Sequence, residues 1–214
     1  EHEKLSCREG DDLALKLTGL SWYCDDGEWK NELGQTWSLE KIIGIELGKS
    51  VVEGHDGGTE RLLGLSAALM NRQRRGQPFD GEYARALKLV RQFHDFALNL
   101  ADGDGAFSPQ FFAARGGGRD PATQLYSCGR IAQWLAYSLP KDKLTDPQMV
   151  KAVDYLATIL LENPNQKWSI GPLGHGLHAL AIYDERLFGG APGKRAAQLA
   201  VAKKDKPKRE AVER

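Results

Sequence analysis

The sequence has few cysteines and no long hydrophobic run. Its 214 residues include only three cysteines, Cys7, Cys24 and Cys128, so at most one disulfide could form and a disulfide-based scaffold is excluded. No apolar run approaches the roughly 18 residues of a membrane-spanning helix, so no membrane span is predicted. Phosphate-loop, dinucleotide-binding and Gly-x-Ser-x-Gly nucleophile motifs are also absent. What remains is a chain with the composition of an ordinary globular domain.

The chain has no excess of charge of either sign. Its 29 basic and 29 acidic side chains cancel, so net charge gives no reason to expect a nucleic acid or an anionic membrane as partner. Residues 191–214 are basic, with eight Lys or Arg against three Asp or Glu. This basic segment, concentrated in residues 194–209, has no interleaved aromatic residues for base stacking, so a nucleic-acid partner is not predicted there either.

Composition divides the chain into three parts. Residues 1–10 are predicted to be an N-terminal extension, residues 11–189 a helical repeat domain, and residues 190–214 a basic, flexible C-terminal tail. The chain begins at Glu1 without an initiator Met and without a basic stretch followed by an apolar one. It is therefore expected to be either a processed secreted or periplasmic protein or a piece of a longer one, with a cytoplasmic location still open.

Apolar residues recur at helical spacing through the central part, and no alternating run typical of a strand competes with them. Ser38 is expected to cap one helix, and Asp146 followed by Pro147 marks the start of another. The predicted fold class is therefore all-α. The expected helices cover, in order, residues 13–20, 39–47, 59–75, 80–100, 125–139, 145–161 and 174–188.

A degenerate internal repeat is visible in the turns between these helices. Three turns are acidic or amide-rich and are followed by an aromatic residue that is expected to fill the gap between neighbouring helical hairpins. The aromatic residues are Trp29, Phe107 and Trp168.

The helices also alternate in character. Those around Leu65, Leu135 and Leu180 are rich in Gly, Ala and Ser, whereas helices 80–100 and 145–161 carry larger apolar faces and more charge. Small residues let helices approach closely, so the first kind is expected to form an inner ring and the second kind an outer ring.

Alternating inner and outer helices joined by such turns resemble the α/α toroid of the terpenoid cyclases and protein prenyltransferases. The resemblance covers roughly residues 11–189, and segments 57–65 and 171–178 look like the inner-helix starts of such barrels. It implies antiparallel helical hairpins arranged as a partial or complete toroid. The Asp-x-Asp-Asp motif of the cyclases and an Asp-Asp-x-x-Asp diphosphate site are absent, so the fold carries over and the chemistry does not.

Aligning the inner helices places Glu60, Arg130 and His175 at equivalent positions near their N-terminal ends. If the helices surround a common axis, these side chains converge at one mouth of the barrel, with Tyr126 beside them. A carboxylate, a guanidinium and an imidazole in one cavity suit an anionic or sugar-like ligand, or proton transfer with His175 or Glu60 as the base. The alternative is structural: an interhelical Glu60–Arg130 ion pair and a His175 that bonds a backbone carbonyl.

Five further residues are predicted to contact a ligand in this mouth or cavity. Helix N-termini there would add positive potential that favours an anion. Trp134, the aromatic residue among them, could alternatively pack between hairpins. The predicted ligand-binding residues are His55, Asp56, Thr59, Trp134 and His178.

No metal or other cofactor is predicted. The set that imitates a zinc site is Cys128, His175 and Asp120, with His178 nearby, yet there is no Cys-x-x-Cys and no adjacent Cys-His pair. Cys128 beside Gly129 also fits a small buried residue where two helices cross closely.

The sequence favours a toroid-like helical repeat module that binds a ligand or a protein partner on its concave face, as part of a larger protein or an oligomer. Two alternatives stay open. One is an enzyme acting on a polysaccharide, as a lyase or hydrolase, or on an isoprenoid, with Glu60, Arg130, His175 and Tyr126 as its working groups. The other is a structural subunit without a small-molecule site.

Overall fold

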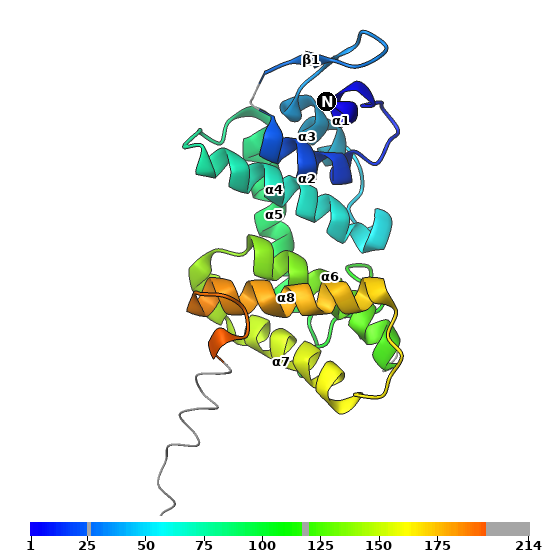
Figure 1. Cartoon of the computed structure of the whole chain (residues 1–214), viewed down its shortest axis with the longest axis vertical. Coiled ribbons are helices and arrows are strands. Elements are labelled where there is room, and N and C mark those ends of the chain that lie inside the picture. The colour runs from blue at the N-terminus through cyan, green and yellow to red at the C-terminus, as the bar shows by residue number, and fades with distance from the viewer. Residues whose placement is uncertain (25–26, 117–119, 196–214) are drawn as a thin grey trace, which may run out of the picture.

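The computed structural model describes residues 1–24, 27–116 and 120–195, and helices dominate these ranges (Figure 1). The predicted all-α fold is confirmed in outline. One small exception is an antiparallel hairpin of two-residue strands, β1 (Trp29–Lys30) and β2 (Thr36–Trp37), which are too short to show the alternation of a strand. The α-helices are α1 (His2–Leu5), α2 (Leu13–Tyr23), α3 (Leu39–Leu47), α4 (Thr59–Arg74), α5 (Gly81–Leu100), α6 (Pro121–Ser138), α7 (Pro147–Glu162) and α8 (Ile170–Phe188). Two 3-10 turns are η1 (His55–Gly58) and η2 (Lys141–Thr145).

Side-chain caps fix two helix starts where the sequence predicted them. Ser38 Oγ accepts a hydrogen bond from the Lys41 amide at 3.0 Å and begins α3. Asp146 accepts one from the Gln148 amide at 2.9 Å and begins α7, with Pro147 as its first residue. The starts of α3 and α7 are therefore determined by local hydrogen bonds and not by tertiary packing.

The helices pack in two series. In the first, α2 packs on α4, α4 on α6 and α6 on α8; in the second, α3 packs on α5 and α5 touches α7. Figure 1 shows α2, α3 and α4 in the upper half of the molecule, α6, α7 and α8 in the lower half, and α5 at the junction. Successive helices of each series are thus two α-helices apart in the chain.

Small residues let the helices of the first series lie close together. A Cβ atom on Gly64 of α4 would lie 2.4 Å from the carbonyl oxygen of Ala14 in α2. A Cβ on Gly129 of α6 would lie 3.0 Å from the backbone nitrogen of Gly176 in α8. The glycines at these crossings are therefore required by backbone contact, which fits the prediction that this kind of helix packs tightly.

The last helix of the first series is less buried than its neighbours. Leu65 of α4 and Leu135 of α6 have no exposed surface, whereas Leu180 of α8 is only partly buried. α8 buries only Gly176, Ala179 and Tyr183 of its 19 residues. One side of α8 is thus without a packing partner among the residues that the structure describes.

The two ends of the chain are described unequally. Residues 1–10 contain α1 and the buried Cys7, whose carbonyl oxygen accepts a hydrogen bond from Asn31 Nδ2 at 2.8 Å, so this extension packs against the β-hairpin. Of the predicted tail, residues 196–214 lie outside the described ranges, as do residues 25 and 26 of the first predicted turn. Within the described ranges, no helix combines the length and the apolar character needed to cross a membrane.

Candidate functional site

The centre of the candidate site is Asp56, in the turn η1 that precedes α4. Its backbone has φ 51°, in the left-handed region that side-chain-bearing residues seldom adopt. Gly57 and Gly58 follow with φ of 60° and 87°, and a Cβ on Gly58 would lie 2.0 Å from the carbonyl oxygen of Val51. Thr59 Oγ1 donates to the Asp56 carbonyl oxygen at 2.9 Å. The predicted ligand residue Thr59 is therefore buried and serves to hold this turn.

Two side chains from α6 hold the Asp56 carboxylate. Tyr126 Oη donates to Oδ1, and the Arg130 guanidinium forms an ion pair with Oδ2. Tyr126 and Arg130 are four residues apart, so they share one face of the helix. Burial, with a further contribution from the hydrogen bond to Asp56, raises the pKa of Tyr126, so the phenol stays protonated and donates at neutral pH. Only 4% of the Asp56 side chain is exposed, which makes this an interhelical contact with little access to water.

A second carboxylate orients an exposed histidine. His55 Nδ1 lies 3.1 Å from Glu60 Oε2 and 3.4 Å from Asp56 Oδ2, while 74% of the His55 side chain is exposed. With Nδ1 directed at the carboxylates, Nε2 is left for a proton or a ligand. The arrangement is that of an imidazole whose orientation is fixed by an acid, which suits hydrogen bonding or general base chemistry.

Gln133 of α6 links two histidines of α8. Its Oε1 lies 2.6 Å from His175 Nδ1, and its Nε2 lies 2.8 Å from His178 Nδ1. Because an amide accepts at oxygen and donates at nitrogen, this orientation assigns the proton to His175 Nδ1 and leaves His178 Nδ1 as an acceptor. Burial first, and the positive charge of Arg130 second, lower the pKa of His175, so that ring is neutral at pH 7.

The predicted working groups are paired differently from the expectation. The partner of Arg130 is Asp56 rather than Glu60. Glu60 instead contacts His55, and His175 bonds Gln133. Arg130 lies close enough to His175, and Glu60 to Tyr126, for their charges to add to the effect of burial on the pKa of those groups. The expectation that all three aligned residues stand near helix N-termini is wrong for Arg130. α6 begins at Pro121, so Arg130 lies more than two turns inside it, beyond the reach of the positive potential of that end.

Trp134 lies apart from this cluster. Its ring is 1% exposed, and its Nε1 donates to Ser66 Oγ of α4 at 3.1 Å. His94 of α5 packs on its face, with ring centroids 4.9 Å apart. The structure therefore places Trp134 in the core between hairpins, which is the packing alternative that the sequence left open.

Asp120, Cys128 and His175, the three residues considered as zinc ligands, each have another role in the structure. Asp120 caps α6 by accepting a hydrogen bond from the Thr123 amide at 2.9 Å. Burial raises the pKa of Cys128 to about 11, so its thiol stays protonated and is a poor metal ligand. His175 directs Nδ1 at Gln133. These residues form no common ligand set.

A different trio could offer metal ligands. One possible ligand atom from each of His55, Asp56 and Glu60 lies within 4.8 Å of the others. Among the described residues, these three form the one cluster of His, Cys, Asp or Glu side chains close enough to share a metal ion. The guanidinium of Arg130 already occupies Asp56 Oδ2, and its positive charge opposes a cation at the same oxygen. Hydrogen bonding to a ligand is therefore a better use of this cluster than metal binding.

Sequence reasoning missed two residues of the site. Gln133 is one of two buried amides of α6, with Gln124, on a helix that buries mostly small and apolar side chains, so its type alone does not single it out. Phe111 has φ 54° and packs edge-on against Tyr126 at 5.4 Å between ring centroids. A Cβ on Gly57 would lie 2.2 Å from Phe111 Cβ, so the η1 turn packs closely against the loop that contains Phe111. No local sequence pattern predicts this contact.

Comparisons with known proteins give no assignment. The chain matches no protein-family model, no curated protein and no solved structure. The function is therefore argued from the geometry above.

Proposed function

We propose that the chain is an arc of α/α helical hairpins, similar to part of a toroid, which binds a hydroxyl-rich, sugar-like ligand on its concave side. The binding site would be the polar cluster formed by His55, Asp56, Glu60, Arg130 and His175. Support for the arc comes from the two series of helices, in which α2, α4, α6 and α8 are successive neighbours. The resemblance to terpenoid cyclases and protein prenyltransferases is retained for the fold alone.

The observation that carries the proposal is the contact of Asp56 with Tyr126 and Arg130. A buried carboxylate on a left-handed backbone is costly, and here two side chains from another helix compensate it. This contact fixes the turn that presents His55 and Glu60, whose side chains are 74% and 18% exposed. Costly local geometry that positions exposed polar groups is typical of a binding site.

Charge distinguishes between the two ligand types that the sequence suggested. The carboxylates of Asp56 and Glu60 outnumber the single guanidinium of Arg130, so the cluster offers no surplus of positive charge for an anion. Carboxylate oxygens, imidazole nitrogens and a guanidinium together supply both acceptors and donors for hydroxyl groups. A sugar-like ligand is therefore favoured over an anionic one.

Exposed apolar residues on the two outermost helices of the first series support an incomplete ring. Leu15 and Trp22 of α2 are 61% and 49% exposed, and Ile170 and Leu177 of α8 are 90% and 51% exposed. Such surfaces fit a neighbouring hairpin of a larger protein or a second copy of the chain. If the arc is a purely structural subunit, the exposed apolar faces of α2 and α8 would contact neighbouring hairpins and the polar cluster would bind no ligand.

An enzyme acting on a polysaccharide is the second candidate, because His55 has the geometry of an oriented base. The raised pKa of Tyr126 counts against Tyr126 as the base of a lyase, since that role needs an ionised phenol near neutral pH. An isoprenoid substrate has less support at this site, because the cluster is polar and Trp134 lies in the core.

The test is binding to an array of neutral and uronic-acid-containing oligosaccharides. We expect the wild-type chain to bind neutral glycans and the variants His55→Gln and Glu60→Gln to bind at least tenfold more weakly. His2→Gln, a change of an exposed histidine in α1, is the matched control and should bind like wild type. Absence of glycan binding, or equal binding by all variants, would overturn the proposal. Release of reducing ends or of ultraviolet-absorbing unsaturated products would favour the enzyme instead.

A further inference from the structure

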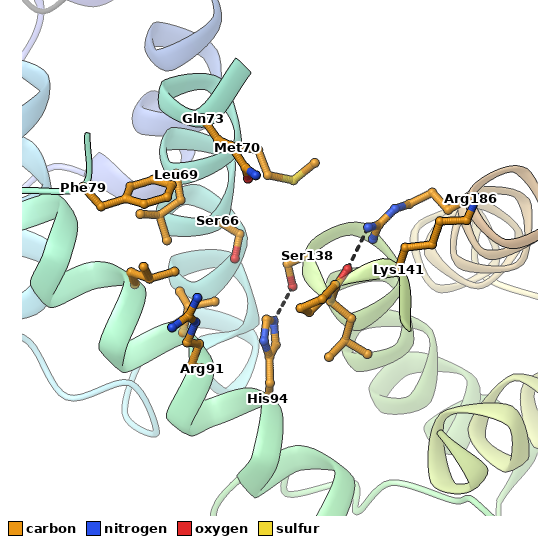
Figure 2. A pocket seen from close by; sticks show the side chains of 14 residues that line it. Ser66, Leu69, Met70, Gln73, Phe79, Arg91, His94, Ser138, Lys141 and Arg186 are labelled. Atoms are coloured by element: carbon orange, nitrogen blue, oxygen red, sulfur yellow. Dashed lines mark hydrogen bonds between the residues drawn. The ribbon is translucent and has the colours of Figure 1, made fainter. Parts of the chain in front are cut away.

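A cavity lies at the opposite end of the contact between α4 and α6 from the polar cluster. Trp134 of α6 bonds Ser66 of α4, and beyond this bond Met70 and Gln73 of α4 lie across a space from Ser138 at the end of α6 (Figure 2). A space of about 470 Å³ opens there, within the range of about 300 to 1,000 Å³ that small-molecule sites occupy. Figure 2 shows side chains of α4 and α5 on one side and the residues after α6, with Arg186 of α8, on the other.

The two sides of this cavity differ in chemistry. α4 and α5 supply an apolar wall that includes Leu69, Leu87 and Val90. Lys141 and Arg186 stand together on the facing side in Figure 2, and Arg91 adds a third positive charge from α5. Among the described lining residues there is no Asp or Glu. An apolar surface combined with uncompensated positive charge is complementary to an amphiphilic anion.

None of the three basic side chains of the cavity, Arg91, Lys141 and Arg186, forms an ion pair within the described part of the chain. Arg186 donates to the carbonyl oxygens of Ala136, Tyr137 and Leu139 at 2.6, 2.8 and 2.7 Å, which binds the end of α6 but leaves the charge uncompensated. Lys141 and Arg91 are therefore both exposed cations whose head groups bond none of the described residues, and Lys141 stands beside the fixed positive charge of Arg186 (Figure 2).

The histidine in this cavity adds no charge of its own. His94 Nε2 lies 2.7 Å from Ser138 Oγ, and Ser138 in turn donates to the Trp134 carbonyl oxygen at 2.7 Å. Ser138 therefore accepts from His94 Nε2, and because burial lowers the pKa of His94 to about 4, the imidazole is neutral at pH 7. His94 and Ser138 therefore find their hydrogen-bond partners within the protein, and the space beside the apolar wall is available to the hydrocarbon chain of a ligand.

We propose that this cavity binds a medium-chain fatty acid, with its hydrocarbon chain against Leu69, Leu87 and Val90 and its carboxylate at Lys141. The carboxylate is placed at Lys141 because Lys141 stands beside the second positive charge of Arg186, whereas Arg91 projects from the α5 side of the cavity (Figure 2). A ligand with several phosphates would meet Arg186 already occupied by three carbonyl groups. The site is independent of the polar cluster proposed above to bind a sugar-like ligand.

Calorimetric titration of the full chain with decanoate, below its micelle concentration, tests the proposal. Decanol is the matched neutral probe, because it has the same chain and no charge. We expect Lys141→Gln to weaken decanoate binding about tenfold, since a charge-assisted hydrogen bond is lost, and to leave decanol binding unchanged. Lys88→Gln, an exposed lysine of α5 outside the lining, should bind both probes like wild type.

Met70→Trp provides a second, charge-neutral test. Met70 is 36% exposed at the edge of the cavity, so an indole there should fill the space and abolish binding of both probes while the chain still folds. His55→Gln should bind decanoate normally, which separates this site from the polar cluster. No decanoate binding by wild type, or equal binding by wild type, Lys141→Gln and Met70→Trp, would overturn the proposal.

Discussion

Gly64 of α4 faces the carbonyl group of Ala14 in α2 so closely that a Cβ atom would lie 2.4 Å from its oxygen. Neither backbone can yield easily, because each belongs to a regular helix with its own hydrogen bonds. The distance between the first two helices of the series is therefore set by the lack of a side chain at one position.

Replacing Gly64 with Ala should destabilise the protein by about 2 to 3 kcal/mol, because the added methyl group forces α2 and α4 apart. Gly19, an exposed residue of α2 with no atom near its missing Cβ, is the matched control. Gly19→Ala should stabilise by about 0.5 to 1 kcal/mol through helix propensity. Urea unfolding followed by circular dichroism measures both changes, and an equal effect of the two would contradict the close contact.

The Asp56–Arg130 pair should behave as a coupled unit. Asp56→Asn leaves a largely buried guanidinium without its counter-charge, so we expect a loss of about 3 kcal/mol. Arg130→Gln leaves the buried carboxylate with only its bond from Tyr126 and should cost a similar amount. The double variant should be more stable than the sum of the two losses implies, by about 1 to 3 kcal/mol in a double-mutant cycle. Additive losses would show that the pair does not interact.

His94 should make stability depend on pH between about 4 and 6.5. Burial lowers the pKa of His94 from 6.5 to about 4, so in this interval the unfolded chain takes up a proton that the folded chain does not. The stabilisation is complete above pH 6.5, and up to about 3 kcal/mol is lost as the pH falls through this window.

His94→Gln is the variant that isolates this effect, because the amide can still donate to Ser138 but does not titrate. Its free energy of unfolding should fall less steeply than that of wild type from pH 6.5 to 4. His2→Gln, at an exposed position, should follow the wild-type curve. Parallel curves for wild type and His94→Gln would mean that His94 is protonated in the folded state.

The three cysteines should react slowly with thiol reagents in the folded protein. Cys7, Cys24 and Cys128 are free and buried, and burial raises the pKa of Cys7 and that of Cys128. A disulfide reagent should therefore modify less than one thiol rapidly in native buffer and all three in denaturant. Rapid stoichiometric labelling of the native chain, lost in Cys128→Ala, would show that Cys128 is an accessible thiolate.

The helices could be predicted from the sequence because their signals are local. Ser38, Asp146 and Pro147 act within one turn of the helices they begin, and the apolar stripe of α5 repeats over its 20 residues. α6 begins four residues earlier than expected, because Asp120 caps it and Pro121 is its first residue, a start signal that apolar periodicity alone does not reveal.

The site could be predicted only as a set of candidates. Repeat alignment predicted that Glu60, Arg130 and His175 converge, and in the structure α6, which carries Arg130, packs against both α4 and α8. Their pairing depends on the left-handed turn at Asp56 and on Gln133, and both act through contacts between residues distant in sequence. The cavity beside His94 lies beyond sequence reasoning altogether, because its lining residues come from segments distant in the sequence.

The hydrogen bond between Trp134 and Ser66 joins α6 to α4 between the Asp56 contact and the cavity. Asp56 joins the helices on one side of it, and the cavity separates them on the other. Because the Trp134–Ser66 bond and the Asp56 contact both hold α4 against α6, a ligand in the cavity need not disturb the Asp56 cluster, and the two proposed sites can be tested separately.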